Sequence, residues 1–189
     1  MPTFDGVLTV TACEARGLPN MDGGLAGGNQ EPFLIMYLEN NYKKLTRAPS
    51  GTDSVRWNET FDFPVGPTQR ELYIECQEKD FNKDDFIGAT VIQLQSIFRD
   101  STDSLDRWYP IHDRQGQPTG EVRLILKYNN NSGVASQLEE KHQQDTTHNA
   151  NKKMAGMVTV GAGLLLGAGF LGKKYLDSRN QEEEERINN

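Results

Sequence analysis

Apolar and polar residues alternate in short segments along the first two thirds of the chain. In the opening segment, Leu8, Val10 and Ala12 would share one face of a strand, with polar residues between them. Clusters of Gly, Asn, Asp and Pro separate the segments, a spacing typical of a β-sandwich or a barrel. We expect an all-β domain, an eight-stranded antiparallel β-sandwich with a helical turn at 94–100. The predicted strands cover residues 6–18, 32–39, 42–48, 56–64, 71–77, 86–94, 107–111 and 120–128.

The pattern changes after residue 128. Residues 129–153 carry few apolar side chains and many Asn, Gln, Thr and His residues, so we expect a flexible, disordered polar linker there. Residues 154–172 are uncharged, and lysines precede and follow them. Residues 173–189 form a short charged tail. The chain is therefore predicted to hold one domain, in residues 1–128, followed by a linker, one C-terminal hydrophobic helix and a tail.

The uncharged segment 154–172 is predicted to be a transmembrane helix. As a helix it would reach about 28 Å, close to the hydrocarbon thickness of a bilayer. Gly163 and Gly167 form a GxxxG pair, a spacing that lets two transmembrane helices approach closely, so they are candidate helix-pairing residues of a homo-oligomer. Two alternatives stay open: a buried helix rich in Gly and Ala, or a tail that contacts its own domain.

Charge and cysteine content narrow the class of protein. The net charge of -7 argues against nucleic-acid binding. The first residues do not combine a basic stretch with an apolar one, so no signal peptide is expected. Cys13 and Cys76 lie in strand-like segments, and we expect free thiols in a cytosolic domain. This order of segments predicts a tail-anchored, single-pass membrane protein whose domain faces the cytoplasm.

The sequence carries no pattern that indicates an enzyme. The three histidines, His112, His142 and His148, do not have the spacing of a metal site or a catalytic triad. The glycines near residue 25 precede a strand and do not form a phosphate-binding loop. We therefore expect a binding protein without a catalytic residue.

Five motifs, in order, resemble those of the C2 domain family. They are GVLTVTACEARGLPNMD, EPF, RWNETFDF, DDFIG, and WYPI followed by GEVRLILKY. The resemblance covers about two thirds of the chain and implies two four-stranded antiparallel sheets with variable loops at one end. Because the chain begins at GVLTV and the domain ends at GEVRLILKY, it resembles the circular permutation called type II, as in small plant and fungal C2 proteins.

The resemblance also implies candidate calcium ligands, because family members that bind Ca²⁺ use several aspartates of the first and third loops. Gln77 and Lys79 stand where the two central carboxylates of the third loop would be. Two interpretations stay open, a degenerate domain without metal and a domain with one weakly bound Ca²⁺, so no cofactor is required. The candidate ligands are Asp22, Glu31, Asp80 and Asp85.

Two groups of residues are candidates for lipid binding. Residues 1–128 hold 13 Lys and Arg residues against 19 Asp and Glu residues, so the domain as a whole is acidic. Apolar loop tips could enter a bilayer or pack on other loops, and a basic cluster could bind headgroups or be an ordinary solvated hairpin. The residues are Met21, Leu25 and Phe81 at the tips, and Lys43, Lys44 and Arg47 in the cluster.

Together these features predict a tail-anchored C2 module at the cytosolic face of a membrane. It would bind phospholipid or an unidentified protein partner, with weak calcium dependence or none. The alternative is a soluble C2 interaction or signalling protein of the stress- or elicitor-response type, whose glycine-rich tail self-associates.

Overall fold

The computed structural model describes residues 5–21, 30–38, 43–50, 54–81, 83–99 and 104–155. All eight predicted strands are confirmed, as is the short helix near residue 97. The strands are β1 (Gly6–Arg16), β2 (Pro32–Tyr37), β3 (Lys43–Leu45), β4 (Val55–Val65), β5 (Glu71–Glu78), β6 (Asp85–Gln93), β7 (Leu105–His112) and β8 (Pro118–Asn129), and the helices are α1 (Gln95–Arg99) and α2 (Ser132–Ala155).

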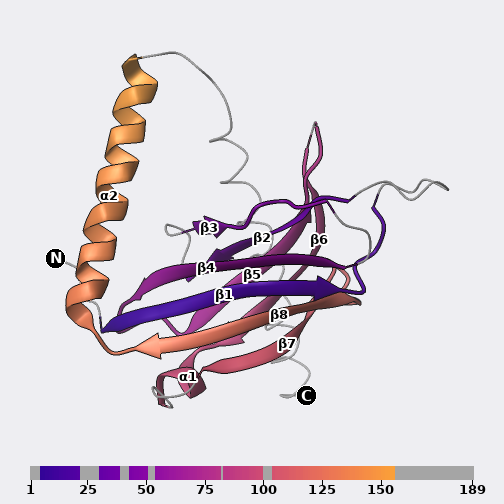
Figure 1. Ribbon diagram of the computed structural model, residues 1–189, viewed down its shortest axis with the longest axis horizontal. Helices are drawn as coiled ribbons and strands as arrows, with labels where there is room; N and C mark the ends of the chain where they lie inside the picture. The colour runs from indigo at the N-terminus through magenta and orange to yellow at the C-terminus, as the bar shows by residue number, and fades with distance from the viewer. Residues whose placement is uncertain are drawn as a thin grey trace, which may run out of the picture.

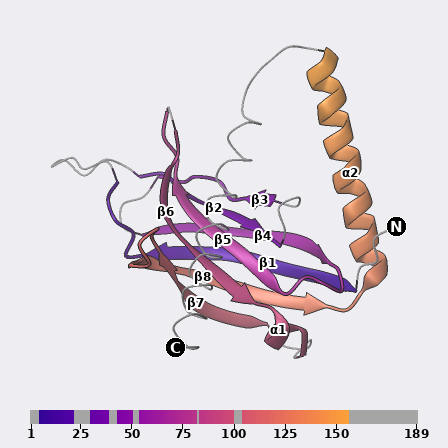
Figure 2. The same ribbon diagram turned by 180° about the vertical axis from the view of Figure 1, so that it is seen from behind.

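The strands form two four-stranded antiparallel layers, which can be followed from both sides in Figures 1 and 2. The hydrogen-bonded order is β3-β2-β5-β6-β7-β8-β1-β4. Between β6 and β7 only one residue pair, Ala89 with His112, joins the two layers in the described part of the chain. The first and last strands, β1 and β8, lie side by side along almost their whole length. The predicted antiparallel sandwich is therefore confirmed.

The main core fills the space between the layers. On β1, Leu8, Val10 and Ala12 all point inward and are fully buried, as their alternation predicted. A register shift after Ala12, present against both β4 and β8, then changes the alternation at Cys13. Both cysteines are free thiols and buried, as expected from the sequence.

Two contacts fix how closely the layers approach each other. The indole of Trp57 on β4 donates a hydrogen bond to the carbonyl oxygen of Pro32 on β2, at 3.0 Å. On β6, a Cβ added to Gly88 would lie 2.5 Å from Thr119 Oγ1 and 3.1 Å from the carbonyl oxygen of His112. The glycine of the DDFIG motif is thus required where β6 passes β7 and β8.

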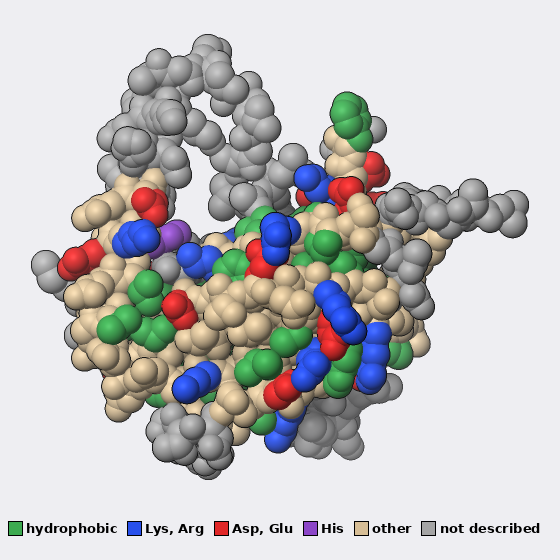
Figure 3. All heavy atoms as spheres, in the orientation of Figure 1, with side chains coloured by type: hydrophobic (Ala, Val, Ile, Leu, Met, Phe, Trp, Pro, Cys, Tyr) green, Lys and Arg blue, Asp and Glu red, His purple; other side chains and the backbone are tan. Residues whose placement is uncertain are grey.

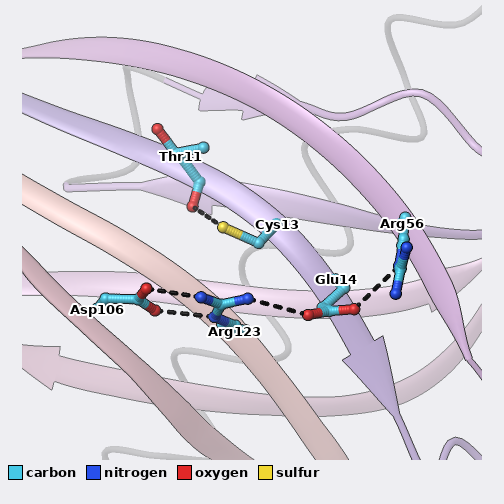
Figure 4. A network of polar contacts seen from close by, with 6 residues as sticks. All are labelled: Thr11, Cys13, Glu14, Arg56, Asp106 and Arg123. Atoms are coloured by element: carbon cyan, nitrogen blue, oxygen red, sulfur yellow. Dashed lines mark hydrogen bonds and ion pairs between the residues drawn. The ribbon is translucent and has the colours of Figure 1, made fainter.

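A chain of ion pairs crosses the outer surface of the β4-β1-β8-β7 layer (Figure 4). Arg123 donates to Asp106 at 2.7 Å and to Glu14 at 3.1 Å, and Glu14 also accepts from Arg56 at 3.1 Å. The hydrogen bond from Arg123 lowers the pKa of Asp106. The neighbouring Cys13 thiol donates to the carbonyl oxygen of Thr11, and burial raises its pKa. The ion pairs connect four strands, and the raised pKa of Cys13 disfavours the reactive thiolate.

Residues 132–155 form one long helix, whereas the sequence predicted a linker without regular structure. The helix begins where the Asn131 side chain accepts a hydrogen bond from the Val134 amide, at 3.1 Å. Ala135 is fully buried, and the helix packs on β1 and β4. Most residues of α2 are polar in sequence, which is why composition alone indicated a linker.

The candidate transmembrane segment lies almost wholly outside the described residues. Helix α2 ends at Ala155, so Gly163, Gly167 and the tail 173–189 are not described. Among the described residues, no helix combines the length and the apolar character needed to cross a membrane.

Candidate loop-end binding site

Two connections of the sandwich meet at the end opposite the start of α2. The connection from β1 to β2 ends at Glu31, and its carbonyl oxygen accepts a hydrogen bond from the Lys79 amide at 3.1 Å. Next along the ladder, Pro32 pairs with Glu78, and Glu78 also pairs with Asp85 on β6. The described end of the first loop is thus adjacent to the base of the third loop.

The connection between β5 and β6 projects beyond the sandwich and carries an exposed aromatic ring. Phe81 is 99% exposed. The Asp80 carboxylate accepts from the Phe81 amide, and the Asp84 carboxylate accepts from the Asp80 amide at 3.2 Å. These bonds brace the turn that presents Phe81. Figure 3 shows a hydrophobic side chain at the end of this projection, with charged side chains just below it.

The described candidate calcium ligands do not converge on one point. Glu31 accepts a hydrogen bond from Ser50 Oγ at 3.3 Å, while Asp80 and Asp85 are exposed on the projection. Asp22 lies outside the described residues. Within the described ranges, no group of three or more His, Cys, Asp or Glu side chains is placed to hold a metal ion. The calcium site therefore stays a prediction.

The structure changes the assignment of the central third-loop positions. The Gln77 side chain donates to Glu75 at 3.3 Å on the outside of the sheet, so it points away from the loop. Glu78 points to the other side, where its charge helps burial to raise the pKa of the Cys76 thiol. Glu78 is 4% exposed at the base of the loops. Counting by the family's spacing missed this carboxylate, although the inward alternation of Leu72, Ile74 and Cys76 along β5 leads to Glu78.

The three residues of the basic cluster make different contacts. Lys43 lies over the ring of Tyr37 at 5.1 Å, and burial lowers its pKa although Glu75 opposes this shift. Arg47 pairs with Glu59 at 3.3 Å, and Lys44 is half-buried on β3. Whether the three residues bind headgroups stays a prediction, but two of them already face carboxylates.

The structure describes one of the two remaining apolar candidates for lipid contact. Met21 follows β1 and is 37% exposed. Leu25 lies outside the described residues. Phe81 is therefore the predicted lipid contact whose exposure is clearest.

A second apolar cluster lies on the outside of the β3-β2-β5-β6 layer, and the sequence analysis missed it. We call it the outer apolar face. The rings of Tyr37 and Tyr73 stack at 5.1 Å, and Tyr37 donates to the buried Glu75 carboxylate at 2.7 Å. The sequence signal was present, since β2 (PFLIMY) has no polar position. The face consists of Phe33, Ile35, Tyr37 and Tyr73, with Leu45, Ala48 and Val91 packed against them.

A two-layer antiparallel sandwich with its loops gathered at one end defines a class of β-sandwich binding modules. The match to the C2 domain model covers residues 6–111, more than half of the chain. The chain belongs to the C2 domain family.

Curated relatives share about a third of their aligned residues with the chain. Extended synaptotagmin-3 of Xenopus tropicalis is 30% identical over 132 residues, which cover 67% of this chain and 14% of that protein. FT-interacting protein 3 of Arabidopsis thaliana is 33% identical over 124 residues, covering 63% of this chain and 16% of that protein. The chain thus spans only a small part of the length of these relatives.

Solved structures share the fold. A calcium-bound pair of C2 domains from extended synaptotagmin 2 matches with a TM-score of 0.59 and 31% identity, covering 68% of this chain and 47% of that one. A single C2 domain of plant extended synaptotagmin 1 has the same TM-score at 20% identity, covering 68% of this chain and 97% of that one.

Proposed function

We propose that the protein is a non-catalytic C2 module, attached to the cytosolic face of a membrane by residues 154–172. The β5–β6 projection would contact the lipid surface of that membrane. The exposure of Phe81 is the observation that carries this proposal. A fully exposed phenylalanine gains about 1.5–3 kcal/mol on complete burial, and the flanking charged residues keep the rest of the turn in water.

The direction of α2 supports the proposal. The helix and the β5–β6 projection leave the sandwich at opposite ends and point to the same side of the molecule, as both views show (Figures 1 and 2). An anchor that follows α2 and a ring at the end of the projection could therefore reach one bilayer together. At about 1.5 Å per residue, the 24 residues of α2 provide a spacer of about 36 Å.

Calcium would have a minor part in this function. Glu78 is buried at the base of the loops, and Asp85 pairs with it across the β5–β6 ladder. Lys79 lies between Glu78 and Asp80 in the chain and brings a positive charge to the same turn. We propose at most one weakly held Ca²⁺, with oxygen ligands from the first and third loops.

Carbonate extraction of the full chain from cell membranes tests the attachment. We expect the protein to remain with the pellet. Exchanging Leu164, Leu165 and Leu166 for Arg should release it, because each Arg at the centre of a membrane helix costs about 2.5–3.5 kcal/mol on insertion scales. The matched control exchanges Gln137, Gln143 and Gln144 on α2 for Arg. This control adds the same charge outside the segment and should stay in the pellet.

A wild-type chain that washes off with carbonate would contradict the anchor. The soluble alternative would then be the better description of the protein. Retention of the triple-Arg variant in the pellet would also contradict it, because the segment would not be what holds the chain.

A further inference from the structure

The β5–β6 projection carries two lysines beside its exposed phenylalanine. Lys79 and Lys83 each lie two residues from Phe81 in the chain, and both are exposed. At about 3.3–3.6 Å per residue, the backbone of each lysine lies within about 7 Å of Phe81. The Lys79 amide donates to the Glu31 carbonyl oxygen at 3.1 Å, which fixes the base of the projection. The end of the projection thus combines one apolar ring with two cationic side chains.

The ammonium groups of these two lysines are available to an external ligand. Within the described ranges, no ion pair, hydrogen bond or ring contact engages the side chain of Lys79 or Lys83. The basic cluster of the sequence analysis differs in this respect, because Lys43 lies over an aromatic ring and Arg47 pairs with a carboxylate. The projection is therefore the better candidate for binding an anion.

The carboxylates of the same connection are used to brace it. Asp84 accepts from the Asp80 amide at 3.2 Å, and Asp80 accepts from the Phe81 amide. Glu78 and Asp85 form the last pair of the β5–β6 ladder, so they lie at the base of the projection. An aspartate carries its charge close to the backbone, whereas the four-carbon stem of a lysine extends its charge away from it. The two ammonium groups can thus reach a surface that the carboxylates do not contact.

Contact of the ring with a bilayer would bring both lysines to the headgroups. Apolar side chains of interfacial segments enter about 5–10 Å into the boundary between headgroups and acyl chains. Residues within about 7 Å of such a ring along the chain then lie at the level of the lipid phosphates. Lysine stems can follow the apolar ring while their ammonium groups stay at this polar level.

We propose that Lys79 and Lys83 bind the phosphate groups of anionic phospholipids beside the inserted Phe81 ring, without calcium. This inference rests on the proposed contact of the projection with lipid, and it names the lipid class. Phe81 supplies apolar burial whatever the headgroup is, whereas the lysines make the contact depend on anionic lipid. Each lysine should strengthen the contact about five-fold, which corresponds to about 1 kcal/mol near an anionic surface.

Tryptophan quenching in the full chain tests this assignment. Phe81→Trp places an indole at the end of the projection, and acyl chains brominated near the headgroup quench it when it enters the bilayer. The parent chain with Phe81 supplies the background from Trp57 and Trp108. The vesicles contain brominated phosphatidylcholine alone or mixed with phosphatidylserine, and a chelator removes calcium.

Two charge variants are compared in the Phe81→Trp chain. One combines Lys79→Gln with Lys83→Gln. The matched control combines Arg70→Gln with Lys127→Gln and removes the same net charge. Both control residues are exposed, with Arg70 just before the start of β5 and Lys127 on β8, away from the projection.

Phosphatidylserine should increase the quenching in the unmodified Phe81→Trp chain and in the control. In the double lysine variant the increase should be lost, with the contact weakened about thirty-fold on anionic vesicles. Added salt should reduce the increase, because it screens exposed charges over a shorter distance.

Equal responses of the lysine variant and the control would overturn the proposal. An increase that appears only when calcium is restored would also overturn it, because the metal and not the lysines would then recruit the lipid. Strong quenching that is the same with and without phosphatidylserine would overturn this inference alone and support the proposed lipid contact. The absence of quenching in both kinds of vesicle would contradict that contact, and this inference with it.

Discussion

The Trp57 indole on β4 donates a 3.0 Å hydrogen bond to the Pro32 carbonyl on β2, and so ties the two layers together near the loops. Trp57→Phe would remove this donor, leave a buried carbonyl without its partner and reduce the core volume. We expect a loss of about 1–3 kcal/mol in the free energy of unfolding. Guanidinium unfolding followed by circular dichroism measures it, and Trp108→Phe, at a half-buried position on β7, is the control.

The close passage of β6 past β7 and β8 makes Gly88 sensitive to any side chain. Gly88→Ala would place a Cβ 2.5 Å from Thr119 Oγ1 and 3.1 Å from a backbone carbonyl, so we expect a loss of about 1–3 kcal/mol. Gly133→Ala in α2 meets its nearest atom at 3.5 Å and should be neutral or stabilise the helix by up to about 1 kcal/mol. Similar melting temperatures for the two variants would contradict this account.

The strands were predicted from the sequence, whereas helix α2 and the side of β5 on which Glu78 lies were missed. Strand positions follow from alternation, as on β1, because inward residues must be apolar. Helix α2 is mostly polar in sequence, and it is held through Ala135 and the Asn131 cap, which composition does not reveal. Counting back from the DDFIG motif with the family's spacing assigned Gln77 and Lys79, whereas β5 alternates inward at Leu72, Ile74 and Cys76 and so turns Glu78 to the inner side.

Phe81 should affect lipid binding without affecting stability. In a chain ending at residue 155, Phe81→Ala should leave the unfolding transition unchanged, because the ring is 99% exposed. Its partitioning to anionic vesicles should fall by about ten-fold or more, corresponding to the loss of about 1.5–3 kcal/mol of apolar burial. Cosedimentation measures this, with Phe81→Trp as the variant that should retain binding. Equal binding of wild type and Phe81→Ala would contradict lipid contact by this ring.

Calcium binding, if titrated by calorimetry, should depend on Glu78 and not on residue 77. Any binding should be weak, with a dissociation constant of about 10⁻⁴–10⁻³ M, and Glu78→Gln should abolish it. Gln77→Asp should not strengthen it, because that side chain lies on the outer face beside Glu75. A clear gain in affinity from Gln77→Asp would show that position 77 does reach the ion.

The buried Glu75 carboxylate should make stability depend on pH. Burial raises its pKa, although Tyr37, Lys43 and Gln77 favour the ionised form. The folded protein therefore keeps this proton to higher pH than the unfolded chain. The resulting stabilisation is fully present below the ordinary carboxyl pKa and is lost as pH rises through the folded pKa.

Glu75→Gln removes this titration and retains an acceptor for Tyr37. The free energy of unfolding of Glu75→Gln relative to wild type should therefore improve as pH rises from the ordinary carboxyl pKa through the raised pKa of Glu75 in the folded protein. Urea unfolding at several pH values measures it, and the exposed Glu140→Gln on α2 is the control. A difference that does not change with pH would contradict the raised pKa.

If residues 154–172 anchor the chain as proposed, the helical structure of α2 limits where the loops can lie relative to the lipid surface. A coil of the same length would let the domain sample a wide volume, whereas a helix of about 36 Å restricts it to a narrower range of heights. This restriction would raise the effective concentration of the loops at the bilayer. A loop with weak affinity for lipid would then be occupied for more of the time than in a chain without an anchor.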